Sequence, residues 1–284
     1  MAGDSFRIEP VAVFHGEVPL EFTLFSNNLM KRTLLLLTLL IFAFASVQAT
    51  AQTVKRPFNG TDLTGWKTNG DWENCWKAGF LRADATTFEI FQPPANQNQP
   101  RPANQNQARS GMFAPSLANV IDVNWMQMNP RKGVDIYTEE KFGDCTVKLE
   151  FLITKGSNSG VYLMGEYEVQ VADSFAKPNN RLGQGDMGAI YSATAPSLNA
   201  CGVPGTWQSY EIEFVAPKFD ASGNKTANAV FKKVILNGVV VQENVEVKGS
   251  TGGGVTGKEA ATGPLMLQGN HGPVAYRNIE IIVP

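Results

Sequence analysis

Apolar and polar residues alternate with a period of two through much of the second half of the chain. Residues 146–153 and 209–215 follow this pattern closely, and residues 275–283 form a further apolar run. Because successive side chains of a strand point to opposite faces of a sheet, the alternation predicts strands with one buried face. No stretch after residue 51 shows a helical period of useful length.

A hairpin is predicted between residues 230–236 and 239–241. The two runs flank Asn237-Gly238, a pair favoured in type I′ turns, where both central residues take a positive φ. Many strands joined by short turns with Gly, Asn or Pro, without helices, are typical of packed antiparallel sheets. The sequence therefore predicts an all-β fold, a two-layer sandwich or jelly roll.

Composition and charge narrow the class of protein further. The chain has 284 residues, of which 43% are hydrophobic and 18% charged, with 27 Gly and 16 Pro. These values fit one large β domain rich in turns. The net charge of -2 provides no basic field for nucleic acid, and no Lys/Arg cluster supplies one locally. We therefore exclude nucleic acid as a partner.

A secretory signal is predicted at residues 30–51. Lys31 and Arg32 precede the apolar run 34–44, and small residues occupy the positions before a cleavage site between Ala51 and Gln52. The alternative is a membrane anchor, but the run is short for the ~30 Å of a bilayer core. We expect residues 52–284 to be exported to the periplasm or beyond, with no membrane contact after cleavage.

Two further segments stand apart from the predicted domain. Residues 1–29 precede a second plausible initiator, Met30, so we interpret them as a misassigned start, the alternative being an extended n-region. Residues 93–109 contain PANQNQ twice, and such a polar stretch buries too little apolar area to offset its ordering entropy. We predict a mobile insertion there.

The cysteines give little support for a structural metal site. Cys75, Cys145 and Cys201 are an odd number in the exported part, so one thiol must remain outside any intramolecular bridge. No CxxC pair or Cys/His cluster is present, which argues against structural zinc. At least one of the three is expected to act as a small buried hydrophobe.

Seven short motifs occur in order along residues 58–282 and resemble those of the 3-keto-disaccharide hydrolase domain family. Each is weak alone, but seven in order are specific. The motifs are FNGTDLTGW (58–66), KFGD with LEF (141–151), NSGV (158–161), EYEVQVAD (166–173), GAIY (188–191), Trp207, and LQGNHGPV with YRNI (267–279). Two departures are the 93–109 insertion and Gln208, which follows Trp207 where the family has Asn.

This resemblance implies a concanavalin A-like β-sandwich with a sugar-binding cleft on the concave face of one sheet. It also implies exported proteins that act in glycoside breakdown. The same sandwich hosts lectins, so a non-catalytic carbohydrate-binding module stays open as an alternative.

Strand alternation in residues 166–173 puts Glu166, Glu168 and Gln170 on one face. Such a row is either a solvated face or the floor of a ligand site, and the resemblance favours the floor. Sugar-binding roles are assigned to Gln170, Asn158, Tyr191, Trp207 and Gln268. The aromatic members would stack on a pyranose ring, whereas Trp66 is expected to pack in the core.

His271 is the only imidazole after the predicted cleavage site, and it lies in a Gly/Pro turn. Imidazole is an effective general base near neutral pH, the alternative being an exposed loop histidine. Arg277 interrupts an apolar strand, either as a catalytic cation or in a structural ion pair with a carboxylate such as Glu168. The predicted catalytic set is therefore His271, Glu168 and Arg277.

A conventional retaining glycosidase needs two carboxylates about 5 Å apart, and no ExDxxE strand motif is present. For a 3-keto sugar, one base can remove the acidified C2 proton, and the enolate then expels the group at C1. The expected roles are His271 as base, Arg277 as oxyanion stabiliser and Glu168 with Gln170 on sugar hydroxyls. A divalent metal bound by Glu168 could replace Arg277. A separate oxidoreductase would supply the substrate, because no GxGxxG cofactor motif occurs.

Overall fold

The computed structural model describes residues 52–70, 76–84, 88–91, 115–119 and 133–284. All of them belong to one compact unit, residues 51–284. The predicted start, signal segment, insertion and Cys75 lie outside the described residues. No helix in the described part is long and apolar enough to cross a membrane.

The described part is built almost wholly of antiparallel strands, with one short 3-10 helix, η2 (Asn179–Arg181). The early strands are β1 (Thr53–Lys55), β2 (Trp66–Asn69), β3 (Trp76–Ala83), β4 (Phe88–Phe91), β5 (Pro115–Asn119), β6 (Asp135–Phe142), β7 (Cys145–Ile153), β8 (Asn158–Leu163) and β9 (Tyr167–Ala172). The later strands are β10 (Gln208–Val215), β11 (Lys218–Phe219), β12 (Lys225–Ala227), β13 (Ala229–Leu236), β14 (Val239–Val247), β15 (Gly263–Leu267) and β16 (Val274–Val283).

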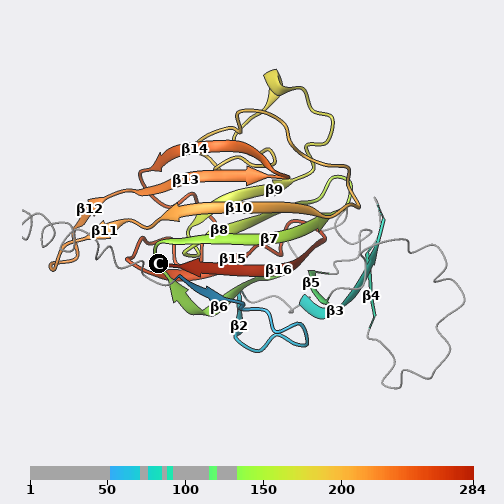
Figure 1. The fold of residues 1–284 in the computed structure, drawn as a ribbon, viewed down its shortest axis with the longest axis horizontal. Coiled ribbons are helices and arrows are strands. Elements are labelled where there is room, and N and C mark those ends of the chain that lie inside the picture. The colour runs from blue at the N-terminus through green and yellow to red at the C-terminus, as the bar shows by residue number, and fades with distance from the viewer. Residues whose placement is uncertain (1–51, 71–75, 85–87, 92–114, 120–132) are drawn as a thin grey trace, which may run out of the picture. The chain divides into compact units, whose positions relative to one another are not determined.

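Two large sheets form the sandwich that the alternation predicts. The nine-stranded sheet has the order β14-β13-β10-β7-β16-β5-β3-β4, with β1 paired to β16, and the five-stranded sheet has the order β2-β6-β15-β8-β9. In Figure 1 five strands of the larger sheet run side by side in front of β9, β8 and β15 of the smaller sheet; these five are β14, β13, β10, β7 and β16. β11 and β12 form a separate two-stranded ribbon.

The predicted strands are confirmed at β7, β10, β13, β14 and β16. In β7 the residues Val147, Leu149 and Phe151 are buried in the core, while the residues between them are only half-buried. Asn237 and Gly238 have φ values of 51° and 81° between β13 and β14. This is the positive-φ pair that a type I′ turn requires.

The core lies between the two sheets. Phe151, Tyr210 and Phe231 of the larger sheet and Val161 and Val169 of the smaller sheet belong to one continuous buried cluster. Two buried hydroxyls cross between the sheets: Tyr210 donates to the Gln170 carbonyl at 2.6 Å, and Tyr276 lies 2.9 Å from the Ser159 hydroxyl. Each large ring therefore fills the core and satisfies its polar end.

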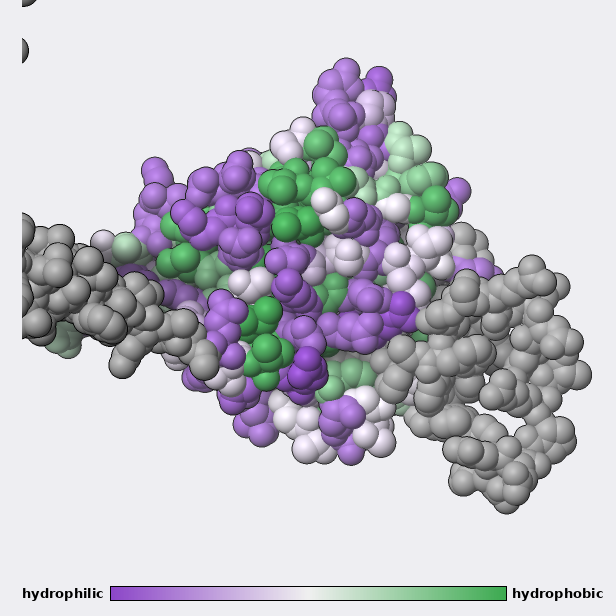
Figure 2. Space-filling view, in the orientation of Figure 1, coloured by the Kyte–Doolittle hydropathy of each residue, from purple (hydrophilic) through white to green (hydrophobic). Residues whose placement is uncertain are grey.

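The outer face of the nine-stranded sheet is a solvated surface. Figure 2, in the orientation of Figure 1, shows hydrophilic residues predominating over the strands of this face. Lys148 pairs with Glu211 at 3.1 Å, and Lys233 lies 3.9 Å from Glu213. Exposed pairs of this kind contribute about 0–1 kcal/mol each, so this face adds solubility more than stability.

Candidate active site

The outer face of the five-stranded sheet carries buried polar side chains. Glu168 stands opposite Tyr162, and Gln170 stands opposite Gly160, in the pairing of β9 with β8. The intervening residues Tyr167, Val169 and Val171 lie in the core cluster, so the two faces differ as the sequence predicts. Glu168 and Gln170 are nonetheless only 2% and 3% exposed. A polar row this deeply covered is not a solvated face.

Residues of the neighbouring strands complete this polar floor. Met266 of β15 pairs with Tyr162, which puts Gln268, two residues on, on the same face. Met266 also pairs with Tyr137 of β6, so Asp135 shares this face as well. We call Asp135, Tyr162, Glu168, Gln170 and Gln268 the floor; all five are buried.

Tyr162 and Glu168 form a hydrogen-bonded pair at the centre of the floor. The Tyr162 hydroxyl donates to the Glu168 carboxylate and accepts from Gln268 Nε2 at 3.2 Å. Burial raises the pKa of Glu168 to about 8; the hydrogen bond from Tyr162 opposes this rise and the Asp135 charge adds to it. Burial also raises the pKa of Tyr162, and the nearby Glu168 reinforces that rise. Burial therefore keeps Glu168 predominantly protonated at neutral pH, where a tyrosine is uncharged in any case.

Gly160 explains how the Glu168 carboxyl fits on the floor. A Cβ at this position would lie 2.2 Å from Glu168 Oε1 and 2.8 Å from its carboxyl carbon. The carboxyl group therefore occupies the space above the glycine. Ser159, its neighbour, donates to the Gln268 carbonyl at 2.7 Å on the core side. The NSGV motif thus positions both Glu168 and Gln268.

Two floor amides leave acceptor oxygens without a partner. Gln170 Nε2 donates to Asn158 Oδ1 at 2.5 Å, while Gln170 Oε1 and Gln268 Oε1 are buried and unpaired in the described part. An unmet buried acceptor costs about 1–3 kcal/mol.

The loop after β15 carries His271 and is attached to the floor through Asp135. Asp135 Oδ1 accepts from the Gly269 backbone at 2.8 Å, and the space for a Cβ at Gly272 is filled by atoms of Ser157 and Asn158. His271 itself is exposed, and its Nδ1 contacts Asn270 Oδ1. The imidazole therefore sits on a loop that is fixed at both sides. Burial raises the pKa of Asp135 to about 6, although the backbone amide of Gly269 opposes this.

Tyr191 borders the floor on the edge of β9. Its backbone N–H donates to the Glu168 carbonyl at 3.1 Å, and its side chain is 40% exposed. An exposed ring held beside buried polar groups can stack on a pyranose.

Arg277 lies outside this group, so its predicted role as oxyanion stabiliser is wrong. It pairs in register with Glu150 on the nine-stranded sheet, and its Nε and Nη2 both lie 2.6 Å from Glu150 Oε2. Its neighbour Tyr276 points into the core, so Arg277 points away from the smaller sheet. Both sheets therefore separate Arg277 from Glu168. The alternative prediction for Arg277, a structural ion pair with a carboxylate, is confirmed, but the partner is Glu150 and not Glu168.

Trp207 is also displaced from the floor. The Arg277 guanidinium carbon lies 3.9 Å from the centre of its ring, so a cation covers one face of this predicted sugar platform. Trp66, by contrast, packs in the core as predicted, with its ring N–H donating to the Pro57 carbonyl.

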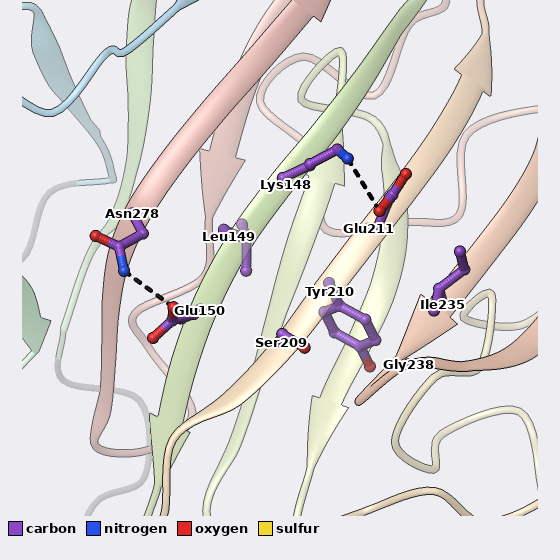
Figure 3. A pocket seen from close by; sticks show the side chains of 9 residues that line it. All are labelled: Lys148, Leu149, Glu150, Ser209, Tyr210, Glu211, Ile235, Gly238 and Asn278. Atoms are coloured by element: carbon purple, nitrogen blue, oxygen red, sulfur yellow. Dashed lines mark hydrogen bonds and ion pairs between the residues drawn. The ribbon is translucent and has the colours of Figure 1, made fainter. Parts of the chain in front are cut away.

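An open depression of about 280 Å³ lies on the larger sheet, and none of its lining residues belongs to the floor. Figure 3 shows its lining, in which Lys148 contacts Glu211 and Asn278 contacts Glu150. The charged groups drawn there already have partners: Lys148 pairs with Glu211, and Glu150 accepts from Asn278 and pairs with Arg277. We therefore do not assign the candidate site to it.

The described residues contain no group of three or more His, Cys, Asp or Glu side chains that could hold a metal ion. The predicted metal role of Glu168 thus has no full set of protein ligands in this part of the chain. Cys145 and Cys201 are free thiols, and burial raises their pKa values to about 12 and about 11.

Sequence reasoning did not identify Asp135 or Tyr162. Asp135 lies before the first predicted strand, residues 146–153, and Tyr162 occupies one position of a run that reads as apolar. The signal that could have found Tyr162 was the alternation of NSGVYL, which puts it on the face of Asn158 and Gly160.

Comparison with known proteins identifies the family. The profile of the 3-keto-alpha-glucoside-1,2-lyase-like domain matches residues 53–282. The chain belongs to this family. Membership places the 3-keto-alpha-glucoside-1,2-lyase-like domain of this chain among carbohydrate-active proteins.

A solved structure of 28% identity supports the fold. A "putative glycosyl hydrolase" from Parabacteroides distasonis is 28% identical, with a TM-score of 0.52, over 80% of this chain and 82% of its own. A second from the same organism is 16% identical, with a TM-score of 0.46, over 80% and 92%. No curated protein matches the chain. The predicted jelly-roll sandwich is confirmed.

Proposed function

We propose that this protein is an exported enzyme of the glycosidase type that cleaves 3-keto-glycosides by C2 proton removal and β-elimination. Family membership supports action on a glycosidic bond. The observation that carries the elimination chemistry is the buried pair in which Tyr162 is hydrogen-bonded to Glu168, a carboxyl group whose pKa burial raises to about 8.

The reaction begins at C2 of the oxidised sugar. His271 takes the C2 proton, and the electron pair of that C–H bond forms a C2=C3 double bond with negative charge on the C3 oxygen. The enolate then re-forms the C3 carbonyl, makes a C1=C2 double bond and breaks the bond from C1 to the leaving oxygen. That oxygen accepts a proton from the imidazolium. Addition of water across C1 and C2 completes a net hydrolysis.

The floor supplies what this sequence of steps requires. A carboxylic acid held neutral by burial can donate a hydrogen bond to a developing oxyanion. Protonated Glu168, supported by Tyr162, takes in this proposal the role that the sequence assigned to Arg277. The unpaired oxygens of Gln170 and Gln268 accept hydrogen bonds from sugar hydroxyls, and Tyr191 stacks on the ring.

The substrate must be made by another protein. Oxidation at C3 requires an oxidoreductase, and this sequence carries no dinucleotide fingerprint. The predicted signal at residues 30–51 would send the enzyme to the periplasm or beyond, where it would meet oxidised glycosides.

A paired assay of a 3-keto-disaccharide and its unoxidised parent tests the proposal. We expect rapid cleavage of the keto sugar alone, because one imidazole cannot remove a C2 proton that lacks the neighbouring carbonyl. His271→Ala should lower turnover by about 10²–10⁴ while binding changes little. Glu168→Gln keeps a neutral donor and should retain part of the activity. Sugar binding without turnover of either substrate would indicate a lectin-like module instead.

A conventional glycoside hydrolase is the second candidate, because the floor holds two buried carboxyl groups. Asp135 and Glu168 have raised pKa values of about 6 and about 8, as an acid and base pair would require. Equal rates on the keto and parent sugars, with Glu168→Gln and Asp135→Asn both inactive, would favour this candidate.

A further inference from the structure

The glycine-rich segment 251–257, which leads from β14 to β15, is fastened to the edge of β9 by Glu166. Glu166 Oε1 accepts from the backbone N and the Oγ1 of Thr256 at 2.8 and 2.7 Å, and its Oε2 accepts from the Gly257 N at 3.0 Å. The Glu166 side chain is buried although it belongs to the polar row. Its carboxylate therefore faces the segment. The sequence placed Glu166 on the same face as Glu168, but Glu166 lies just before β9 begins and its carboxylate binds Thr256 and Gly257 instead.

The same segment touches both members of the central pair. Thr251 Oγ1 accepts from the Glu168 backbone N at 2.9 Å and donates to the Glu166 carbonyl at 3.2 Å. At Gly253 a Cβ would lie 3.0 Å from the Tyr162 hydroxyl, and φ is +70°. The backbone thus passes directly beside the Tyr162 oxygen, where a side chain would crowd it.

We propose that Glu166 is a positioning residue, which holds segment 251–257 against the Tyr162–Glu168 pair and so keeps the pair covered and aligned. Two carboxylate oxygens accept three hydrogen bonds here, two of them from backbone N–H groups. A glutamine would turn its NH₂ group toward at least one of these donors. The fastening therefore depends on the charged acceptor and not only on side-chain size.

Loosening the segment should change the acidity of Glu168. Glu168 interacts with Tyr162 on β8 and Asp135 on β6, and its charge also raises the pKa values of the core residues Tyr210 and Tyr276. Tyr191, beyond β9, acts on Tyr162. None of these groups belongs to segment 251–257. Burial is the main cause of the raised pKa of Glu168. Entry of water over the pair would thus return that pKa toward its ordinary value of 4.5.

The test is a carboxyl ¹³C NMR titration of the full exported protein, with the Glu168 signal assigned by its loss in Glu168→Gln. We expect Glu166→Gln to lower the Glu168 midpoint by at least about one pH unit and Thr256→Val to lower it less. Glu246→Gln is the matched control, because Glu246 is exposed on β14 and bonds Asn228. It should leave the midpoint unchanged. If Glu166→Gln does not fold, Thr256→Val decides, since it removes only one of the three bonds.

The kinetic arm rests on the proposed function, whereas the titration does not. On a 3-keto-glycoside, Glu166→Gln should lower kcat/KM about tenfold and move the alkaline limit of activity to lower pH, as expected for a displaced donor. A protein inactive on every keto sugar would refute the proposed function, and the midpoint would still decide the role of Glu166. A folded Glu166→Gln protein with the wild-type midpoint would overturn the positioning role.

Discussion

Replacing Glu168 with glutamine should make the protein more stable in alkaline solution. The pKa of Glu168 rises from 4.5 to about 8 on folding, mainly because the carboxyl is buried. Between pH 4.5 and about pH 8, the Glu168 carboxyl therefore keeps its proton in the folded state but has lost it in the unfolded chain. Its stabilising contribution is complete below pH 4.5 and is lost as the pH rises through about 8.

The size of the effect follows from the two pKa values. Each pH unit between them corresponds to about 1.4 kcal/mol, so the free energy of unfolding loses at most about 5 kcal/mol through this group. Local opening that admits water would reduce the loss, and we expect about 2–3 kcal/mol. Glutamine resembles the protonated acid and does not titrate, so Glu168→Gln should be spared this loss.

Thermal unfolding at pH 5 and pH 9 measures the difference. The two proteins should melt within a few degrees of each other at pH 5. At pH 9 the variant should melt about 5–10 °C higher, because each kcal/mol moves the Tm of a domain this size by about 2–4 °C. Glu211→Gln on the solvated face is the control and should follow the wild type. Equal pH dependence of Glu168→Gln and the wild type would refute a buried, protonated Glu168.

Other substitutions and a processing test distinguish the remaining claims. Gly160→Ala puts a Cβ where the Glu168 carboxyl lies, so it should destabilise by about 1–3 kcal/mol and lower turnover at least tenfold, measured by melting and the keto-sugar assay. Arg277→Leu should lower the free energy of unfolding by about 1–2 kcal/mol without changing kcat, because Arg277 and its partner Glu150 both lie on the nine-stranded sheet, away from the floor. A large loss of kcat in a folded variant would contradict this placement. N-terminal sequencing of exported protein should begin at or near Gln52, and retention of residues 30–51 would contradict the predicted signal.

The fold could be predicted because its strands obey local rules. The alternation in β7 and β10 and the turn at Asn237-Gly238 depend only on neighbouring residues. The prediction of which face of β9 is turned to the core is also confirmed, because Val169 and Val171 lie in the core.

The candidate site was harder to predict, because it depends on which strands become neighbours. The pairing of Tyr162 with Glu168 joins β8 to β9, but the approach of Asp135 requires β6 and β15 to lie beside them. Alternation puts a residue on a face without saying which sheet that face belongs to. Arg277 shows the consequence: its side chain points outward, but from the nine-stranded sheet and not from the sheet that carries Glu168.

At the edge of β9, the loops that satisfy the backbone hydrogen bonds of the strand also cover the Glu168 carboxyl. An edge strand exposes unpaired backbone groups that invite association with other chains. Here Thr251 covers the Glu168 N–H and Tyr191 covers the Glu168 carbonyl, so two loops close the edge at the same residue. The loops that satisfy this edge are therefore also the walls of the floor. Any change that loosens one of them exposes backbone and carboxyl together, which is why stability and acidity should change jointly at Glu168.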